Sequence, residues 1–223
     1  MNRTDHDEAV AQYRACAASY DKVTRYMESV RCQAIDMLAL RPGDTVLDVA
    51  CGTGKSFALL QERVGPRGRI IGIDISPDML ALARQRVQRA GWDNVTLIQS
   101  SMEQARIAAE VDALLFSYTH DVLRSRAALD NIFRYAKPHA HVAAAGMKHF
   151  PWWLAPLNVL VWFKARGFTT TREGFARPWS VLAEYVDEIA VEPMYGGIAY
   201  VASAVHRAAL RHAVALAPID ASI

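Results

Sequence analysis

Cysteine is scarce in this chain. It occurs three times among 223 residues, and an odd number argues against a framework of disulfides. Free thiols persist in a reducing compartment, so we expect a cytoplasmic protein. No uninterrupted apolar run reaches the roughly 20 residues that a membrane-spanning helix needs. The polar residues 1–8 also lack the apolar centre of a signal peptide.

An excess of charge of one sign is missing as well. Lys and Arg number 25 and Asp and Glu number 23, which leaves a formal net charge of +2. Because no basic run is present, we expect no nucleic-acid partner. No group of His, Cys and Asp has the spacing of metal ligands, so we expect no metal. Internal repeats and low-complexity linkers are absent, and 52% hydrophobic residues suffice for the core of one domain.

What the sequence does contain is a buried-strand pattern, 45–49, that breaks into a Gly-x-Gly turn and runs into a helical segment from Lys55. A strand, a glycine turn and a helix N-terminus together form a nucleotide pocket. Gly52 and Gly54 let the backbone turn sharply and approach a ligand with no Cβ in the way. Asp48 lies just before this turn, and we expect its carboxylate to face the same crevice.

Two common nucleotide motifs do not fit this turn. A dinucleotide fingerprint has a third glycine where Phe57 stands, and a Walker loop has a glycine where Val49 stands. The sequence also lacks a Tyr-x-x-x-Lys pattern or another hydride-transfer site. A nicotinamide oxidoreductase is therefore disfavoured.

A second buried strand, 69–74, ends at Asp74, which lies 22 residues after Gly52. This separation is close to the ~20 residues at which an acid meets ribose hydroxyls in nucleotide-binding α/β units. Its two carboxylate oxygens can accept from both hydroxyls. Ser76 and Pro77 suit the start of a helix. A strand-end aspartate is otherwise a cap or a surface group, but its distance from the glycine turn favours the ribose role.

The segment 48–54 resembles motif I of the class I S-adenosylmethionine-dependent methyltransferases, in which a glycine is commoner than Ala50. The chain is similar to their small-molecule branch, which includes the ubiquinone and menaquinone C-methyltransferases. The resemblance implies binding of S-adenosylmethionine, transfer of its methyl group to N, O, C or S, and release of S-adenosylhomocysteine. It also implies an α/β fold: a Rossmann-like, seven-stranded, mostly parallel sheet with an antiparallel final strand, helices on both faces, an N-terminal helical arm, and a helical and aromatic cap after strand five.

The order of strands and helices along the chain agrees with this fold and predicts right-handed crossovers. Further strands are expected at 94–99, 111–118 and 142–145, with a helix from Ser125, another from Pro178 and a closing hairpin within 190–204. Residues 137–140 read Lys-Pro-His-Ala where relatives usually have Lys-Pro-Gly-Gly. The single methyltransferase domain, 1–223, is expected to divide into an arm (1–40), a cofactor-binding core (41–146), a cap or substrate segment (147–180), a closing helix and hairpin (181–204) and a tail (205–223).

The resemblance implies a set of cofactor-binding residues in the arm, at the first two strand ends and in the loops after strands three and four. They are Tyr20, Asp48, Ala50, Cys51, Gly52, Gly54, Asp74, Ile75, Met79, Ser101, Met102 and Ser117. Ser101 stands where many relatives place an aspartate that accepts from the adenine amine, and a hydroxyl accepts more weakly. Met102 offers its backbone N–H to the ring. Tyr20 would close over the cofactor or substrate, or pack at a helix junction, and Cys51 is expected to pack rather than react.

Methyl transfer from a sulfonium mainly requires alignment of the acceptor and exclusion of water. A base is needed only when the acceptor must first lose a proton. The catalytic candidates are His120, just past a strand end, and His149, with Asp121 as a third potential base; each is otherwise a wall residue. The substrate-binding candidates are Tyr118, Trp152, Trp153 and Tyr195, although strand-end tyrosines are commonly part of a core.

The segment 147–163 holds three of the five tryptophans. It is a lid over an apolar pocket, an extra packed helix, or a segment in contact with a membrane interface. The Asn/Asp-Pro-Pro-Tyr motif of many DNA-adenine and protein-glutamine methyltransferases is absent, so we expect a small, partly apolar acceptor such as a secondary metabolite. The alternatives are a lipid headgroup or isoprenoid quinone at a membrane surface and, in another class, a non-catalytic nucleoside-binding module.

Overall fold

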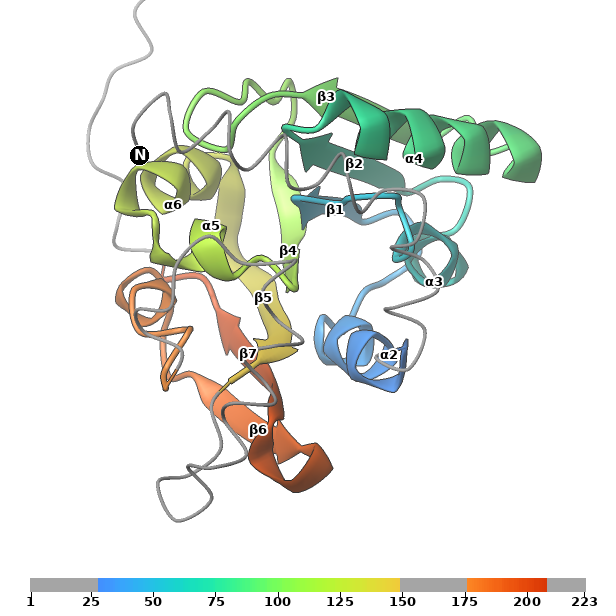
Figure 1. Ribbon diagram of the computed structural model, residues 1–223. Coiled ribbons are helices and arrows are strands. Elements are labelled where there is room, and N and C mark those ends of the chain that lie inside the picture. The colour runs from blue at the N-terminus through green and yellow to red at the C-terminus, as the bar shows by residue number, and fades with distance from the viewer. Residues whose placement is uncertain (1–27, 149–175, 208–223) are drawn as a thin grey trace, which may run out of the picture.

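The computed structural model describes residues 28–148 and 176–207 (Figure 1). Several sequence predictions lie outside these ranges: the first helix of the arm, most of the cap segment and the tail. Tyr20, His149, Trp152 and Trp153 are outside them too. These assignments stay predictions.

Seven strands form one sheet in the order β3-β2-β1-β4-β5-β7-β6. β1 to β5 are parallel to one another, whereas β7 is antiparallel to both β5 and β6. The expected mostly parallel sheet with an antiparallel final strand is confirmed. The strands are β1 Thr45–Val49, β2 Arg69–Asp74, β3 Val95–Gln99, β4 Val111–Ser117, β5 Ala136–Met147, β6 Ala190–Met194 and β7 Ala199–Val205.

Helices cover both faces of the sheet, which explains why β1 and β2 are almost continuously apolar (Figure 1). α2 (Glu28–Met37), α3 (Phe57–Val64) and α4 (Pro77–Ala90) pack on one face. α5 (His120–Arg124), α6 (Arg126–Phe133) and the 3₁₀ turn η3 (Leu182–Glu184) pack on the other.

The two hydrophobic cores follow the alternation of side chains along each strand. Val46, Ile70 and Leu115 face α2 and α3, whereas Leu47 and Leu114 belong to the core under α6. The centre of the sheet, at β1 and β4, is therefore almost fully buried.

The structure corrects the helix that was expected from Pro178. Only η3 forms there, since the next residues pair with the end of β7: Asp187 N–H donates to Val205 O at 2.9 Å, and Val186 forms a bridge with His206. A backbone held in a strand pairing cannot continue a helix. A short helix that was not expected, α5, begins at His120.

The fifth strand, β5, is longer than the expected 142–145, since it runs from Ala136 to Met147. It bends near its start, where its pairing with β4 is irregular. At the bend His139 has a φ of +63°, in the left-handed region that favours glycine. The resemblance described above places a glycine at this position, which agrees with a positive φ.

Candidate functional site

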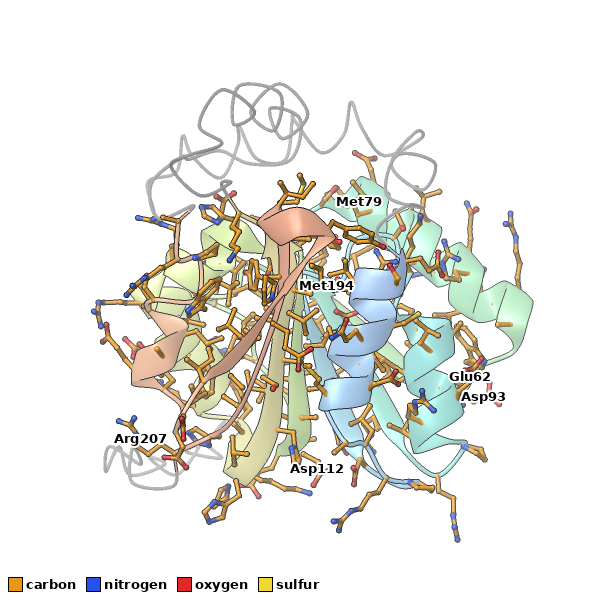
Figure 2. All side chains as sticks on the ribbon, turned by 90° about the horizontal axis from the view of Figure 1, so that it is seen from below. Glu62, Met79, Asp93, Asp112, Met194 and Arg207 are labelled. Carbon is orange, nitrogen blue, oxygen red and sulfur yellow. The ribbon has the colours of Figure 1, made fainter. Side chains whose placement is uncertain are left out.

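The carboxyl ends of the parallel strands meet at one edge of the sheet. β1 lies between β2 and β4, and the chain leaves it toward β2 on one side and reaches β4 on the other. Such a switch point opens a crevice for ligands. Figure 2 shows Met79, in the first turn of α4, at this edge and Asp112, near the start of β4, at the opposite edge.

The glycine turn after β1 is built from left-handed residues. Ala50 has a φ of +51°, Gly52 of +56° and Gly54 of +73°. Cys51 N–H donates to Ile73 O at 2.9 Å, which ties the turn to β2. Backbone N–H groups in such a turn, followed by a helix N-terminus, favour negative or polar ligand atoms.

Phe57 explains why the third glycine of a dinucleotide fingerprint is not needed here. Its ring is fully buried and packs directly under the turn. A Cβ added at Gly54 would lie 2.5 Å from the ring, and one added at Gly72 would lie 2.8 Å from it. The ring of Phe57 occupies the space into which α3 could otherwise move closer to the sheet. The glycine turn therefore keeps its shape because it packs against this ring.

Asp74 holds two loops together. One carboxylate oxygen accepts from Gly52 N–H and the other from Ser76 N–H, each at 2.8 Å. Ser76 in turn caps α4 by accepting from Met79 N–H at 3.3 Å. Burial raises the pKa of Asp74, and the backbone N–H bonds oppose that rise. A carboxylate has about four acceptor positions, so Asp74 can still accept from a ligand hydroxyl beside these backbone bonds.

Asp48 is the most deeply buried acid of the site, at 1% exposed. Burial raises its pKa to about 7, and Asp74 adds to the rise. The positive charge of Arg31 and a hydrogen bond from Ser56 oppose it. Oδ2 of Asp48 has no hydrogen-bond partner among the described residues. A buried acceptor without a partner is uncommon and indicates a ligand group.

Three hydroxyls extend this set of unsatisfied buried atoms. The Oγ atoms of Ser101 and Ser117 and Oγ1 of Thr119 have no partner within the described parts of the chain. Ser101 follows β3, Ser117 ends β4, and Thr119 precedes α5. Thr119 was missed by sequence reasoning, since a threonine before a helix reads as a cap, yet its side chain makes no cap hydrogen bond.

The remaining predicted residues lie at or near the same edge, and their roles stay predictions. His120 begins α5, and Tyr118 before it has a strained φ of +60°. Met79 and Met102 are buried, and Ile75 is half-buried. Tyr195 is 52% exposed, and its hydroxyl contacts that of Ser29 on α2.

Cys51 is buried, and burial raises the pKa of its thiol well above the ordinary value. A thiol held protonated is a poor nucleophile. Its Sγ also lies under β2, where a Cβ at Gly72 would approach it to 2.9 Å. The packing role expected for this residue agrees with that geometry.

No group of three or more His, Cys, Asp or Glu among residues 28–148 and 176–207 could hold a metal ion. In the same parts of the chain, no helix is long and apolar enough to cross a membrane.

Ala50→Gly should stabilise the protein, by about 0.5–1 kcal/mol, because glycine adopts the left-handed conformation without strain. The melting temperature should rise by roughly 2 °C. Ala58→Gly in the exposed face of α3 is the matched control and should destabilise by about 1 kcal/mol. If both variants change the stability in the same direction, Ala50 is not strained.

Comparisons with known proteins agree with this geometry. Residues 40–159 match a family model described as a methyltransferase domain. The demethylmenaquinone methyltransferase of Symbiobacterium thermophilum is 27% identical over 189 residues, which covers 77% of this chain and 74% of that protein. The match to the demethylmenaquinone methyltransferase of Listeria welshimeri, at 28% identity over 106 residues, spans only 45% of each chain.

A solved structure shows the same fold. The N-methyltransferase NodS from Bradyrhizobium japonicum WM9, in complex with S-adenosyl-L-homocysteine, superimposes with a TM-score of 0.59 at 17% identity. The superposition covers 82% of this chain and 88% of that one.

Proposed function

Because this chain belongs to the methyltransferase domain family and is an S-adenosylmethionine-dependent enzyme, we propose that it methylates a small, partly apolar acceptor. The acceptor approaches over the end of β4, beside the glycine turn of β1.

The residues at the sheet edge fit an adenosyl amino acid. Asp74 is placed to accept from the ribose hydroxyls, since its carboxylate has more acceptor positions than the backbone bonds fill. Ser101 and the backbone of Met102 face the adenine side. The left-handed turn at Gly52 and Gly54 lets the backbone approach the ligand closely. When bound, the cofactor supplies a sulfonium-activated methyl group.

One observation carries the proposal. Within the described residues, buried oxygen atoms without partners lie at the carboxyl ends of three strands of the sheet: Oδ2 of Asp48 on β1, Oγ of Ser101 after β3 and Oγ of Ser117 on β4. Buried polar atoms that lack a partner cost free energy unless a ligand satisfies them. An adenosyl amino acid carries donors along its whole length, so it can satisfy them together.

The chain's part in the transfer is to orient the acceptor and exclude water. Ser117, Thr119 and His120 stand at the end of β4, where an acceptor hydroxyl or ring carbon would approach. We assign His120 as the group that accepts a proton when the acceptor must lose one.

A demethylated isoprenoid quinone is the second candidate acceptor. It is favoured by the two relatives named demethylmenaquinone methyltransferase. The quinone headgroup is a small, partly apolar ring, so both candidates share the site. They differ in whether the acceptor is delivered from a membrane.

The test combines labelled cofactor with two acceptor panels. Methyl-labelled S-adenosylmethionine is incubated with water-soluble phenols, and separately with demethylmenaquinone in liposomes. Label in the soluble panel alone supports a soluble acceptor, and label in the liposomes alone supports the quinone. Cofactor binding by calorimetry without label transfer to either panel contradicts both acceptor classes.

Cofactor binding should tighten as the pH rises through 7. Only ionised Asp48 attracts the ammonium group of the ligand, and its pKa is raised to about 7 in the free protein. The dissociation constant of S-adenosylhomocysteine should therefore fall about tenfold between pH 6 and pH 8. Arg31, Ser56, Asp74 and Cys51 face this carboxyl. Calorimetry across this range, with Asp48→Asn as the control, checks the expectation.

The same shift links stability to pH. The folded pKa of Asp48 lies above its unfolded value of 3.8, so the folded state holds an extra proton between these pH values. The stabilisation is complete below about pH 4 and is lost as the pH rises through 7.

In the binding experiment, Asp48→Asn should remove the pH dependence of the dissociation constant. If the dissociation constant of this variant keeps the same pH slope as that of the wild type, another group is responsible for the titration.

A further inference from the structure

The connection between β3 and β4, residues 100–110, contains no helix, and the structure describes all of it. β2 and β1 lie between β3 and β4 in the sheet, so the connection passes two strands without a regular element of its own. Figure 1 shows it running from β3 toward α6. Its first part, the 101–105 loop, therefore takes its position from contacts with neighbouring elements.

Asn131, on α6, holds this loop. Its Nδ2 amide donates to Met102 O at 2.8 Å and to Ala105 O at 2.9 Å. An amide nitrogen carries two hydrogens, so one side chain can satisfy both carbonyls. Met102 and Ala105 are also buried in the core that contains the apolar face of α6. The loop is thus joined to α6 through its backbone as well as through its side chains.

A second contact joins the same loop to the start of α6. Ser125 Oγ donates to Glu103 Oε1 at 3.0 Å, and it also caps α6 by accepting from a backbone N–H. Within the loop, Gln104 N–H donates to Ser101 O at 3.2 Å. The backbone is therefore fixed from within and from α6, at the place where Ser101 and Met102 are proposed to meet the adenine.

We propose that Asn131 is a positioning residue for the recognition of the adenine base. It acts through the loop, because its two hydrogen bonds fix the backbone on which the N–H of Met102 and the hydroxyl of Ser101 are placed. This inference rests on the proposed function, since it assigns which residue on α6 sets the shape of the adenine side of the same site.

The choice between two purine bases reports how firmly this loop is held. Adenine carries an amine at C6 and an acceptor at N1, whereas hypoxanthine carries a carbonyl at C6 and an N–H at N1. The Ser101 hydroxyl can donate or accept, so it can serve both bases. The Met102 N–H can only donate, so it suits N1 of adenine and opposes the N–H of hypoxanthine. A loop that can shift loses this distinction.

The first experiment changes the ligand and leaves the protein intact. Calorimetry on the full-length wild-type chain compares S-adenosylhomocysteine with S-inosylhomocysteine, which carries hypoxanthine in place of adenine and is otherwise identical. S-inosylhomocysteine should bind at least tenfold more weakly.

The second experiment releases the loop from α6. Asn131→Leu keeps the approximate size of the side chain and removes both N–H donors. It should weaken S-adenosylhomocysteine about tenfold and S-inosylhomocysteine much less, so that the ratio of the two dissociation constants falls below about threefold. A merely structural role would lower both affinities by one factor and leave this ratio unchanged.

Asn94→Leu is the matched control. Asn94 Nδ2 also donates to two carbonyls, Gly65 O at 3.0 Å and Gly68 O at 2.9 Å, but it does so at the opposite edge of the sheet, where β2 and β3 begin. The two variants lose the same pair of bonds and should lower the melting temperature by similar amounts. Asn94→Leu should leave the ratio of the two dissociation constants at its wild-type value.

The outcomes separate this role from the proposed function. If the wild type binds neither ligand, the proposed function fails. If it binds both equally, the loop does not read the base, and the role of Asn131 is overturned with that assignment. If the wild type prefers S-adenosylhomocysteine and Asn131→Leu keeps the full preference, Asn131 does not position the loop and the proposed function stands.

Amide hydrogen exchange on the wild type tests the same link if Asn131→Leu does not fold. S-adenosylhomocysteine should slow exchange in residues 101–105 and in α6 together, because the loop and the helix share the bonds of Asn131. S-inosylhomocysteine at equal saturation should slow both less. Slower exchange in the loop with no change in α6 would overturn the proposal.

Discussion

Gly54→Ala should lower the free energy of unfolding by about 3 kcal/mol, the largest stability effect that we expect from a single methyl group. Two costs add. The residue has a φ of +73°, which costs a residue with a Cβ about 1 kcal/mol or more. The new Cβ would also lie 2.5 Å and 2.6 Å from two ring carbons of Phe57, and overpacking of this kind costs about 1–3 kcal/mol.

Gly91→Ala is the matched control for this variant. Gly91 has a similar φ of +66°, but a Cβ there meets no atom within 4 Å. Urea denaturation should therefore give about 1 kcal/mol for Gly91→Ala, and the excess for Gly54→Ala measures the contact with Phe57. Adding Phe57→Leu should recover part of the excess, because the smaller side chain leaves room. If the two variants lose the same free energy of unfolding, the glycine turn is not supported by the ring of Phe57.

Asp74→Ala should weaken the binding of S-adenosylhomocysteine about a hundredfold. Two hydrogen bonds from ribose hydroxyls to a charged acceptor contribute about 3 kcal/mol together. The change also leaves the N–H groups of Gly52 and Ser76 without the acceptor that orders both loops. Isothermal calorimetry measures the loss, with Asp93→Asn, an exposed acid, as the control.

A second ligand separates the ribose from the loops. Adenosine and 2′,3′-dideoxyadenosine differ only in the two hydroxyls, so the wild type should prefer adenosine and Asp74→Ala should not. If Asp74→Ala weakens both nucleosides by the same factor, the carboxylate acts only by holding the glycine turn to the start of α4.

The arrangement of strands was predictable from the sequence because its signals are local. The apolar runs before Gly52 and after Gly68 mark β1 and β2, and Ser76 and Pro77 mark the start of α4, as the structure has them. Left-handed positions were also partly visible. His139 replaces the glycine of related sequences, and its φ is positive. Short-range sterics decide these features, so a single sequence contains them.

Features that depend on contacts between distant segments were not predictable. Arg31 was not singled out, because the burial of one charge in an apolar stripe is decided only when α2 packs against β4, β5 and β7. The helix expected from Pro178 stops early since β7, twenty residues further along, pairs with its backbone. Thr119 stands where a cap residue would, and only the folded structure shows that its hydroxyl makes no cap bond and has no partner among the described residues.

The position of β7 has a consequence for the order in which the molecule can be assembled during its synthesis. β7 lies between β5 and β6 and also packs against α2, so the last described strand supports one of the first described helices. A chain that has left the ribosome only as far as β5 has an unpaired strand edge and a helix without its full support. The glycine turn and Asp74 can form at that point, whereas the packing of α2 is complete only when β7 has paired with β5. A nascent chain can therefore form the residues proposed to bind the ribose before its first described helix is fully packed.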